Sequence, residues 1–132
     1  MIDPIKIEGV TDRGIGNSER VVMRAQTYCD LGHYWIGLGM RQSQNSVFPI
    51  NDNLFWLGKG LIQPGDWIFL YTGWGQPTTT DIPSQTNKIY TFYWKRDRVL
   101  FQSPEIFPYL INAPRVGLPN EMYQNALPSP NE

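Results

Sequence analysis

The sequence has few of the residues from which chemical sites are usually built. Its 132 residues include one cysteine, Cys29, and one histidine, His33. A single cysteine excludes an intramolecular disulfide framework and a metal site made from several thiolates. We therefore predict no metal site, no bound cofactor and no disulfide-stapled scaffold.

An excess of one charge and a long apolar run are also missing. Eleven Lys and Arg residues against twelve Asp and Glu residues give a net charge of −1, whereas a domain that coats nucleic acid usually has a basic excess. The charge therefore favours a protein partner or self-association over nucleic acid. No apolar run reaches the roughly 18 residues of a membrane-spanning helix, and residues 1–20 contain no signal-peptide core. We expect a soluble cytoplasmic protein with no membrane partner, or a module that has lost an export signal.

Aromatic and turn-forming residues are abundant instead. Aromatic side chains make up 14% of the chain, with 5 Trp, 7 Tyr and 6 Phe, beside 12 Gly and 11 Pro. This composition is typical of short strands joined by tight turns. With 41% hydrophobic residues, a chain of this length can fill one core, so the sequence predicts a single all-β domain.

Alternating and apolar segments predict about seven to eight short strands, which favour a β-sandwich. The clearest alternation lies in residues 19–27, where Val21, Met23 and Ala25 would face a core. Residues 67–71 are apolar on both faces and predict a central strand. The expected strands are residues 2–10 (an edge strand), 19–27, 31–40, 54–57, 67–71, 88–94, 99–101 and 106–111.

The segments between these strands predict turns and loops. Asn51-Asp52-Asn53 is a turn cluster, and Pro64-Gly65 fits a type II turn with a positive φ at the glycine. Residues 72–87 predict a long loop with no strand of its own. Residues 95–98 (Lys-Arg-Asp-Arg) predict a charged, hairpin-like turn between two strands.

Near the C-terminus the apolar periodicity ends. From Ala113 onward prolines recur with Asn and Ser, and at most one helical turn is expected, at residues 120–125. We therefore divide the chain into a sandwich domain, residues 1–112, and an irregular Pro-rich C-terminal tail, residues 113–132, that is either wrapped around the body or disordered.

Four segments together resemble lamin-tail-like domains. Residues 60–73 (GLIQPGDWIFLYTG) place a leucine before a Pro-Gly turn, a hydrophobic strand after it and a Thr-Gly at the end. Residues 19–22 resemble the first core strand of that family, and residues 30–36 are similar to its Leu-Ser-Gly-Trp stretch, with one extra residue and no serine. Residues 89–101 lie where the family has its last strand pair. The resemblance spans residues 19–101 and implies an immunoglobulin-like fold and a non-catalytic accessory or protein-binding module, with no catalytic residues to carry over.

His33 and Cys29 are the candidates for chemistry, and the sequence supports neither strongly. His33 could act as a base oriented by a carboxylate from a distant strand, but a half-buried strand histidine bonded to a carbonyl is the favoured interpretation. Cys29 as a nucleophile would need His33 beside it, yet four residues of strand span about 13 Å. We therefore expect no catalytic residues and predict that the chain is not an enzyme.

Aromatic and basic residues outside the core are the candidates for binding. Trp74 lies in a Gly-Trp-Gly loop, either as a recognition platform or as a cap that closes one end of the sandwich. Tyr93 with Lys95, Arg96 and Arg98 could form a basic-aromatic patch, or the charged residues could simply make a solvated turn.

These observations lead to one preferred function and two alternatives. The preferred function is a non-catalytic binding or assembly module that engages a protein partner, with Trp74, Tyr93, Lys95, Arg96 and Arg98 as binding residues. The first alternative is a protein that binds a small ligand, carbohydrate or nucleotide, through loop aromatics. The second alternative is a hydrolase that uses His33.

Overall fold

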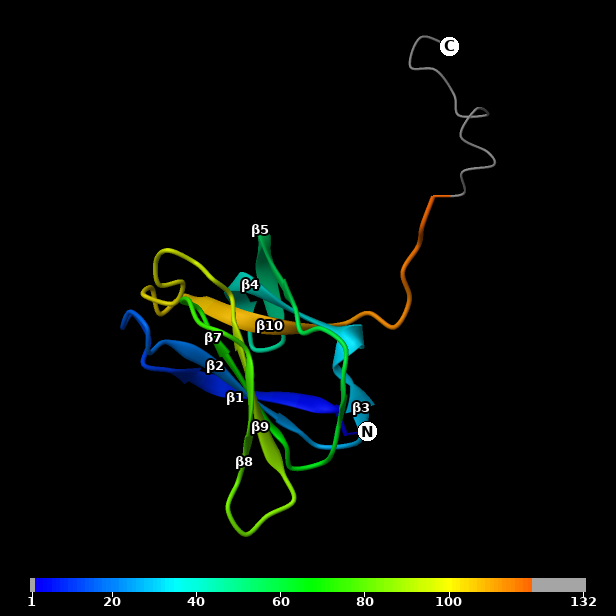
Figure 1. Cartoon of the computed structure of the whole chain (residues 1–132). Coiled ribbons are helices and arrows are strands. Elements are labelled where there is room, and N and C mark those ends of the chain that lie inside the picture. Colours follow the sequence, from blue (N-terminus) through cyan, green and yellow to red (C-terminus); the bar gives the residue numbers. More distant parts are fainter. Residues whose placement is uncertain (1, 120–132) are drawn as a thin grey trace.

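The structure, a computed structural model, describes residues 2–119. Two main β-sheets form the body of this part of the chain (Figure 1). A five-stranded sheet has the order β1-β2-β7-β9-β8, a three-stranded sheet has the order β10-β4-β5, and β3 pairs with β6. The elements are β1 (Ile5–Thr11), β2 (Arg20–Ala25), β3 (Cys29–Asp30), the 3-10 helix η1 (Leu31–His33), β4 (Tyr34–Ser43), β5 (Ser46–Trp56), β6 (Leu61–Ile62), β7 (Trp67–Tyr71), β8 (Thr78–Asp81), β9 (Lys88–Tyr93) and β10 (Ile106–Asn112).

The core lies between these sheets, which confirms the prediction of an all-β sandwich. The alternation in β2 is confirmed as well, because Val21, Met23 and Ala25 are all buried. Phe55 of the three-stranded sheet packs on Phe92 and Trp94, with ring centroids 6.3 and 5.8 Å away. The largest buried apolar side chains are Ile5, Met23, Ile36, Leu57, Ile62, Ile68, Leu70 and Phe101.

β7 is the middle strand of the five-stranded sheet, as its apolar sequence predicts. β2 pairs with it in antiparallel fashion, and β9 pairs with it in parallel. The chain after β7 passes over the end of β9, runs down as β8 and returns as β9 (Figure 1). The prediction that residues 72–87 contain no strand is therefore wrong, because Thr78–Asp81 forms β8 on the outer side of β9.

Two further sequence predictions are corrected by the strand pairing. Residues 51–53 do not end a strand, since β5 runs from Ser46 to Trp56. Gly37 of β4 pairs with Leu54 and Gly39 pairs with Pro49, so the intervening residues of β5 form a bulge, in which Asp52 has a φ of +63°. A bulge absorbs turn-forming residues without ending the strand.

Residues 99–101 are not a strand either, so residues 95–98 do not close a hairpin. The backbone N–H groups of Leu100 and Phe101 donate to the carboxylate of Glu19 and not to a neighbouring strand.

The expected C-terminal tail, residues 113–132, is described only as far as residue 119. Residues 113–119 contain no strand or helix, and the turn expected at residues 120–125 lies outside the described residues.

Glu19 is a buried carboxylate, only 1% exposed, that accepts four hydrogen bonds. Its Oε1 accepts from the backbone N–H of Gly14 at 2.8 Å and of Phe101 at 3.0 Å. Its Oε2 accepts from the hydroxyl of Thr72 at 2.7 Å and from the N–H of Leu100 at 2.8 Å. Glu19 thereby joins the start of β2, the end of β7 and the segment before β10.

Asp66 has the same role at the other end of β7. Its Oδ2 accepts from the N–H of Gln63 at 2.8 Å, and its Oδ1 accepts from Asn87 Nδ2 at 2.9 Å and from the N–H of Lys88 at 3.0 Å. These bonds fix the start of β9 against the start of β7. The predicted type II turn lies here and is confirmed, because the N–H of Asp66 donates to the carbonyl of Gln63 and Gly65 has a φ of +91°.

Replacing the Glu19 carboxylate by an amide should destabilise the fold strongly. In Glu19→Gln, the new NH₂ group points at backbone N–H groups that lose their acceptor, at about 1–3 kcal/mol for each buried orphan donor. We expect the free energy of unfolding in urea to fall by about 2–4 kcal/mol. The exposed Glu8→Gln is the matched control and should change it little. Equal stability of the two variants would contradict the structural role of Glu19.

Gly65→Val should destabilise the turn at the start of β7. Valine is strained at a φ of +91°, and a Cβ here would lie 2.8 Å from Asn87 Oδ1. We expect a loss of about 1–3 kcal/mol, measured as a lower Tm. The control is Gly16→Val, because a Cβ at Gly16 meets no atom within 4 Å. An unchanged Tm for Gly65→Val would show that the turn does not need its glycine.

Candidate functional site

The loop that carries Trp74 lies beside the charged segment after β9. The N–H of Lys95 donates to the carbonyl of Gly73 at 2.9 Å, and the N–H of Arg96 donates to the carbonyl of Thr72 at 2.9 Å. The parallel pairing of β7 and β9 is the cause, since it brings the C-terminal ends of both strands to one edge of the sheet. Residues far apart in sequence thus form one surface at this end of the sandwich.

Trp74 is an exposed side chain with a fixed orientation. It is 61% exposed, and its Nε1 donates to Asp97 Oδ1 at 3.0 Å. A ring that capped the core would be buried, so the end-cap interpretation is wrong. The hydrogen bond holds the indole between solvent and the charged segment, where a partner can reach most of the ring.

Three cations surround an open hollow next to Trp74. The hollow has a volume of about 560 Å³, and its lining includes Lys95, Arg96 and Arg98. Arg96 Nη2 donates to the carbonyl of Asp52 at 3.2 Å, and its guanidinium lies 5.7 Å from the centroid of the Trp94 ring. Lys95 and Arg98 are exposed. The hollow therefore favours an anionic group.

Tyr93 belongs to a neighbouring part of the surface. It projects from the outer face of the five-stranded sheet and stacks on Tyr71, with ring centroids 5.3 Å apart and planes 19° apart. A Cβ at Gly75 would collide with the Tyr93 ring, so the Trp74 loop packs directly on it. The structure therefore brings Trp74 and the three cations together, with Tyr93 supporting the loop from the sheet.

An aromatic row on the same outer face was not predicted from the sequence. Trp67, Phe69 and Tyr71 alternate along β7 and are half-buried. Arg24 lies 4.8 Å from the centroid of the Trp67 ring, and Arg20 lies 5.4 Å from that of Tyr71. The sequence contains the signal: aromatic residues stand at alternate positions of β7, and Arg20 and Arg24 lie on one face of β2. The pairing of the two strands was needed to see that they meet.

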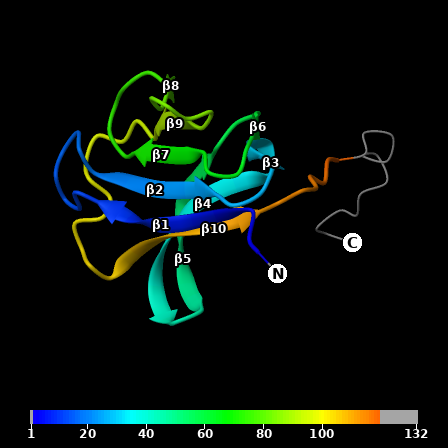
Figure 2. The ribbon, with the colours of Figure 1, turned by 90° about the horizontal axis from the view of Figure 1, so that it is seen from below.

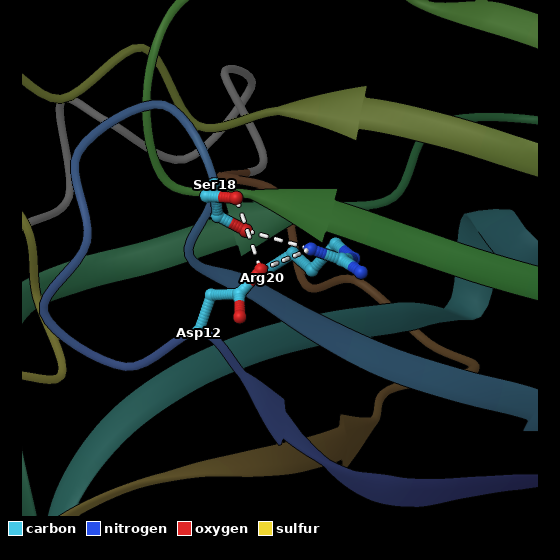
Figure 3. A network of polar contacts seen from close by, with 3 residues as sticks. All are labelled: Asp12, Ser18 and Arg20. Atoms are coloured by element: carbon cyan, nitrogen blue, oxygen red, sulfur yellow. Dashed lines mark hydrogen bonds and ion pairs between the residues drawn. The ribbon is translucent and has the colours of Figure 1, made fainter.

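Arg20 is oriented by the loop that precedes β2 (Figure 3). Its Nη1 donates to Asp12 Oδ2 at 3.1 Å and to the carbonyl of Ser18 at 2.8 Å, while the Ser18 hydroxyl donates to the same Asp12 oxygen at 2.9 Å. The network neutralises Arg20 and holds its guanidinium near the aromatic row. Arg20 therefore belongs to the outer face of the sheet, whereas Lys95, Arg96 and Arg98 lie around the hollow beside Trp74.

His33 lies in a different environment from the one predicted. It is exposed at the end of η1, one residue before β4 begins, and is not a half-buried strand residue. Asp30 starts this turn, since its Oδ1 accepts from the N–H of Gly32 at 2.9 Å and of Gly60 at 3.4 Å. These bonds lower the pKa of Asp30. Within residues 2–119, no hydrogen bond joins the His33 ring to a carboxylate.

Neither a metal centre nor a membrane-crossing helix is found in the described part of the chain. Among residues 2–119, no three His, Cys, Asp or Glu side chains come together in a group that could hold a metal ion. Over the same range, no helix has the length and apolar character needed to cross a membrane.

Comparison with known proteins finds no matching family model, no matching curated protein and no matching solved structure.

Cys29 should react slowly with iodoacetamide in the folded protein. Burial raises the pKa of its thiol, and the nearby Asp30 charge raises it further. A raised pKa leaves less thiolate at pH 8, and the thiolate is the nucleophile. We expect alkylation to be several-fold slower in the native protein than in the same protein unfolded in urea, with the native rate still rising above pH 9. Equal rates would contradict a protected thiol.

Proposed function

We propose that this chain is a non-catalytic binding module that recognises a protein partner through Trp74, Lys95, Arg96 and Arg98. These four residues are called the Trp74 surface below. The observation that carries the proposal is the indole of Trp74, which is 61% exposed and yet held in one orientation by Asp97. An ordered, exposed tryptophan loses little side-chain entropy on binding and offers a large apolar area.

The composition of the Trp74 surface is that of a protein-binding hot spot. Tryptophan and arginine are the residue types most enriched at such positions. Here an apolar ring lies beside three cations, and the one carboxylate among them, that of Asp97, already accepts from the indole. The partner segment that this surface fits has an apolar or aromatic side chain flanked by acidic residues.

A protein partner is favoured over nucleic acid by the charge of the whole chain. The net charge is −1, and Arg20 on the sheet face is paired with Asp12. The three cations beside Trp74 form one short cluster, whereas a nucleic-acid surface follows a backbone over several nucleotides. A short acidic stretch of protein matches the size of the cationic hollow.

The resemblance of residues 19–101 to lamin-tail-like domains supports the same proposal. It implies an immunoglobulin-like sandwich that serves as an accessory or protein-binding module. In sandwiches of this kind, the loops at one end supply the binding residues. The Trp74 surface is made of two such loops, residues 72–77 and 95–98.

Trp74→Ala should weaken partner binding without unfolding the protein. Partners captured from the native source by the wild-type chain are identified and titrated against each variant. We expect a loss of at least about 2 kcal/mol, or about 30-fold in Kd, with an unchanged Tm. Tyr28→Ala is the matched control, because Tyr28 is an exposed aromatic (75%) beyond the opposite end of β2.

The role of the cations in partner binding is tested by charge reversal. Lys95→Glu with Arg98→Glu should also weaken binding, and it should flatten the dependence of Kd on salt. Strong destabilisation by Trp74→Ala without a binding defect would overturn the proposal. Unaltered binding to a protein partner by both the tryptophan and the charge variants would overturn it as well, and a sugar or nucleotide lost with Trp74 would indicate the small-ligand alternative.

A further inference from the structure

A groove separates the two sheets along one side of the sandwich. β1 is an edge strand of the five-stranded sheet, and β10 is an edge strand of the three-stranded sheet. The two strands lie side by side (Figure 2). Two hollows of 330 and 360 Å³ follow this line, and Ile7 lines both of them. We call this feature the edge groove.

Within residues 2–119, no strand pairs with β1 on the side of the edge groove. The N–H of Gln26 donates to the carbonyl of Pro4 at 2.7 Å, so these two residues form a hydrogen-bonded pair of the β1–β2 ladder. Because backbone groups alternate in direction along an antiparallel strand, Ile5 and Ile7 turn their N–H and C=O groups away from β2 and toward the groove.

The same alternation applies to β10. The N–H of Ala113 donates to the carbonyl of His33, and the N–H of Arg41 donates to the carbonyl of Glu105. The odd-numbered residues of β10 therefore bond to β4, and the even-numbered ones face the groove. Ile106 has its carbonyl occupied by Arg13 Nη1 at 3.0 Å, and residue 108 is a proline without an N–H. The open end of the groove is the end near Leu110 and Asn112.

The chain that follows β10 leaves the sandwich at this same open end. Residues 113–119 run outward from Asn112 (Figures 1 and 2). Two large apolar side chains on this segment are exposed, Val116 at 77% and Leu118 at 82%. They are two residues apart, so an extended conformation of this segment would place both on the same side. The segment therefore carries two exposed apolar side chains that a sheet edge could cover.

We propose that residues 113–119 of a second copy of this chain occupy the edge groove and add a strand along β1. Val116 and Leu118 of the second copy then cover Ile7 and Leu110, and its backbone pairs with the free groups of Ile5 and Ile7. The segment points away from the groove of its own copy, so the partner copy supplies it. Exchange in both directions closes a two-fold dimer.

The oligomeric state of the full chain tests this assignment. Light scattering after size exclusion should give twice the 15.2 kDa of one chain at high concentration, and dilution should shift the mass toward one chain. Val116→Asp with Leu118→Asp should give the mass of one chain with an unchanged Tm. The matched control Leu61→Asp, at a site equally exposed at 82%, should keep the wild-type mass.

The groove side is tested by Ile7→Pro, which removes one N–H that faces the groove and none that bonds to β2. A folded Ile7→Pro chain should be monomeric alone and should form a heterodimer when mixed with the Val116→Asp, Leu118→Asp chain, since one intact tail and one intact groove remain. A synthetic peptide of residues 113–119 in excess should dissociate the wild-type dimer, which gives a readout that does not depend on the folding of Ile7→Pro.

Three results would overturn the assignment. They are a wild-type chain that is monomeric at every concentration, a double tail variant that keeps the dimer mass, and a Leu61→Asp chain that loses it. A tail lying in the groove of its own copy would give the first result together with a lower Tm for the double variant. Trp74→Ala should leave the mass unchanged, so this experiment and that on the Trp74 surface fail independently.

Discussion

The buried carboxylate of Glu19 is the interaction on which the arrangement of the binding loops depends. Taking a carboxylate out of water is costly unless its oxygens are satisfied by hydrogen bonds. Glu19 meets this condition with donors from Gly14, Thr72, Leu100 and Phe101. The chain must therefore bring the loop before β2, the end of β7 and the segment after β9 to one point. The loops that make the Trp74 surface begin or end within a few residues of these donors.

A second buried carboxylate, that of Asp66, holds the opposite end of the same strand pair. Asp66 joins β7 to the start of β9 through Asn87 and Lys88, and Glu19 joins the far end of β7 to residues that follow β9. The parallel register of β7 and β9 is thus held by side-chain acceptors at both ends. Parallel pairing provides the common edge, and the carboxylates keep it in register, so Trp74 and Asp97 meet across two different loops.

The sequence predicted the class of fold well because that class depends on local patterns. Alternation at Val21, Met23 and Ala25 and the continuous apolar run of β7 are properties of single strands. The errors occur where a distant partner decides the outcome. Residues 99–101 have strand composition, but Glu19 takes their N–H groups, and Thr78–Asp81 becomes a strand only because β9 offers it an edge. Of the candidate site, the residues were predicted and the contacts were not. The Trp74–Asp97 bond and the stacking of Tyr93 on Tyr71 both depend on strand order.

The position of β9 between β7 and β8 makes the pairing of β8 depend on β9. In the part of the chain that the structure describes, β8 pairs with β9 alone. It therefore joins the sheet only when the chain has turned back at residues 82–87 and β9 lies beside β7. A hairpin of β8 and β9 forms from neighbours in sequence, within microseconds, whereas its docking on β7 closes a much longer loop. The loop over the end of β9, which includes Trp74, takes its final shape only when that docking is complete. The surroundings of the Trp74 indole therefore depend on that docking, and local opening at this end of the sheet would change them.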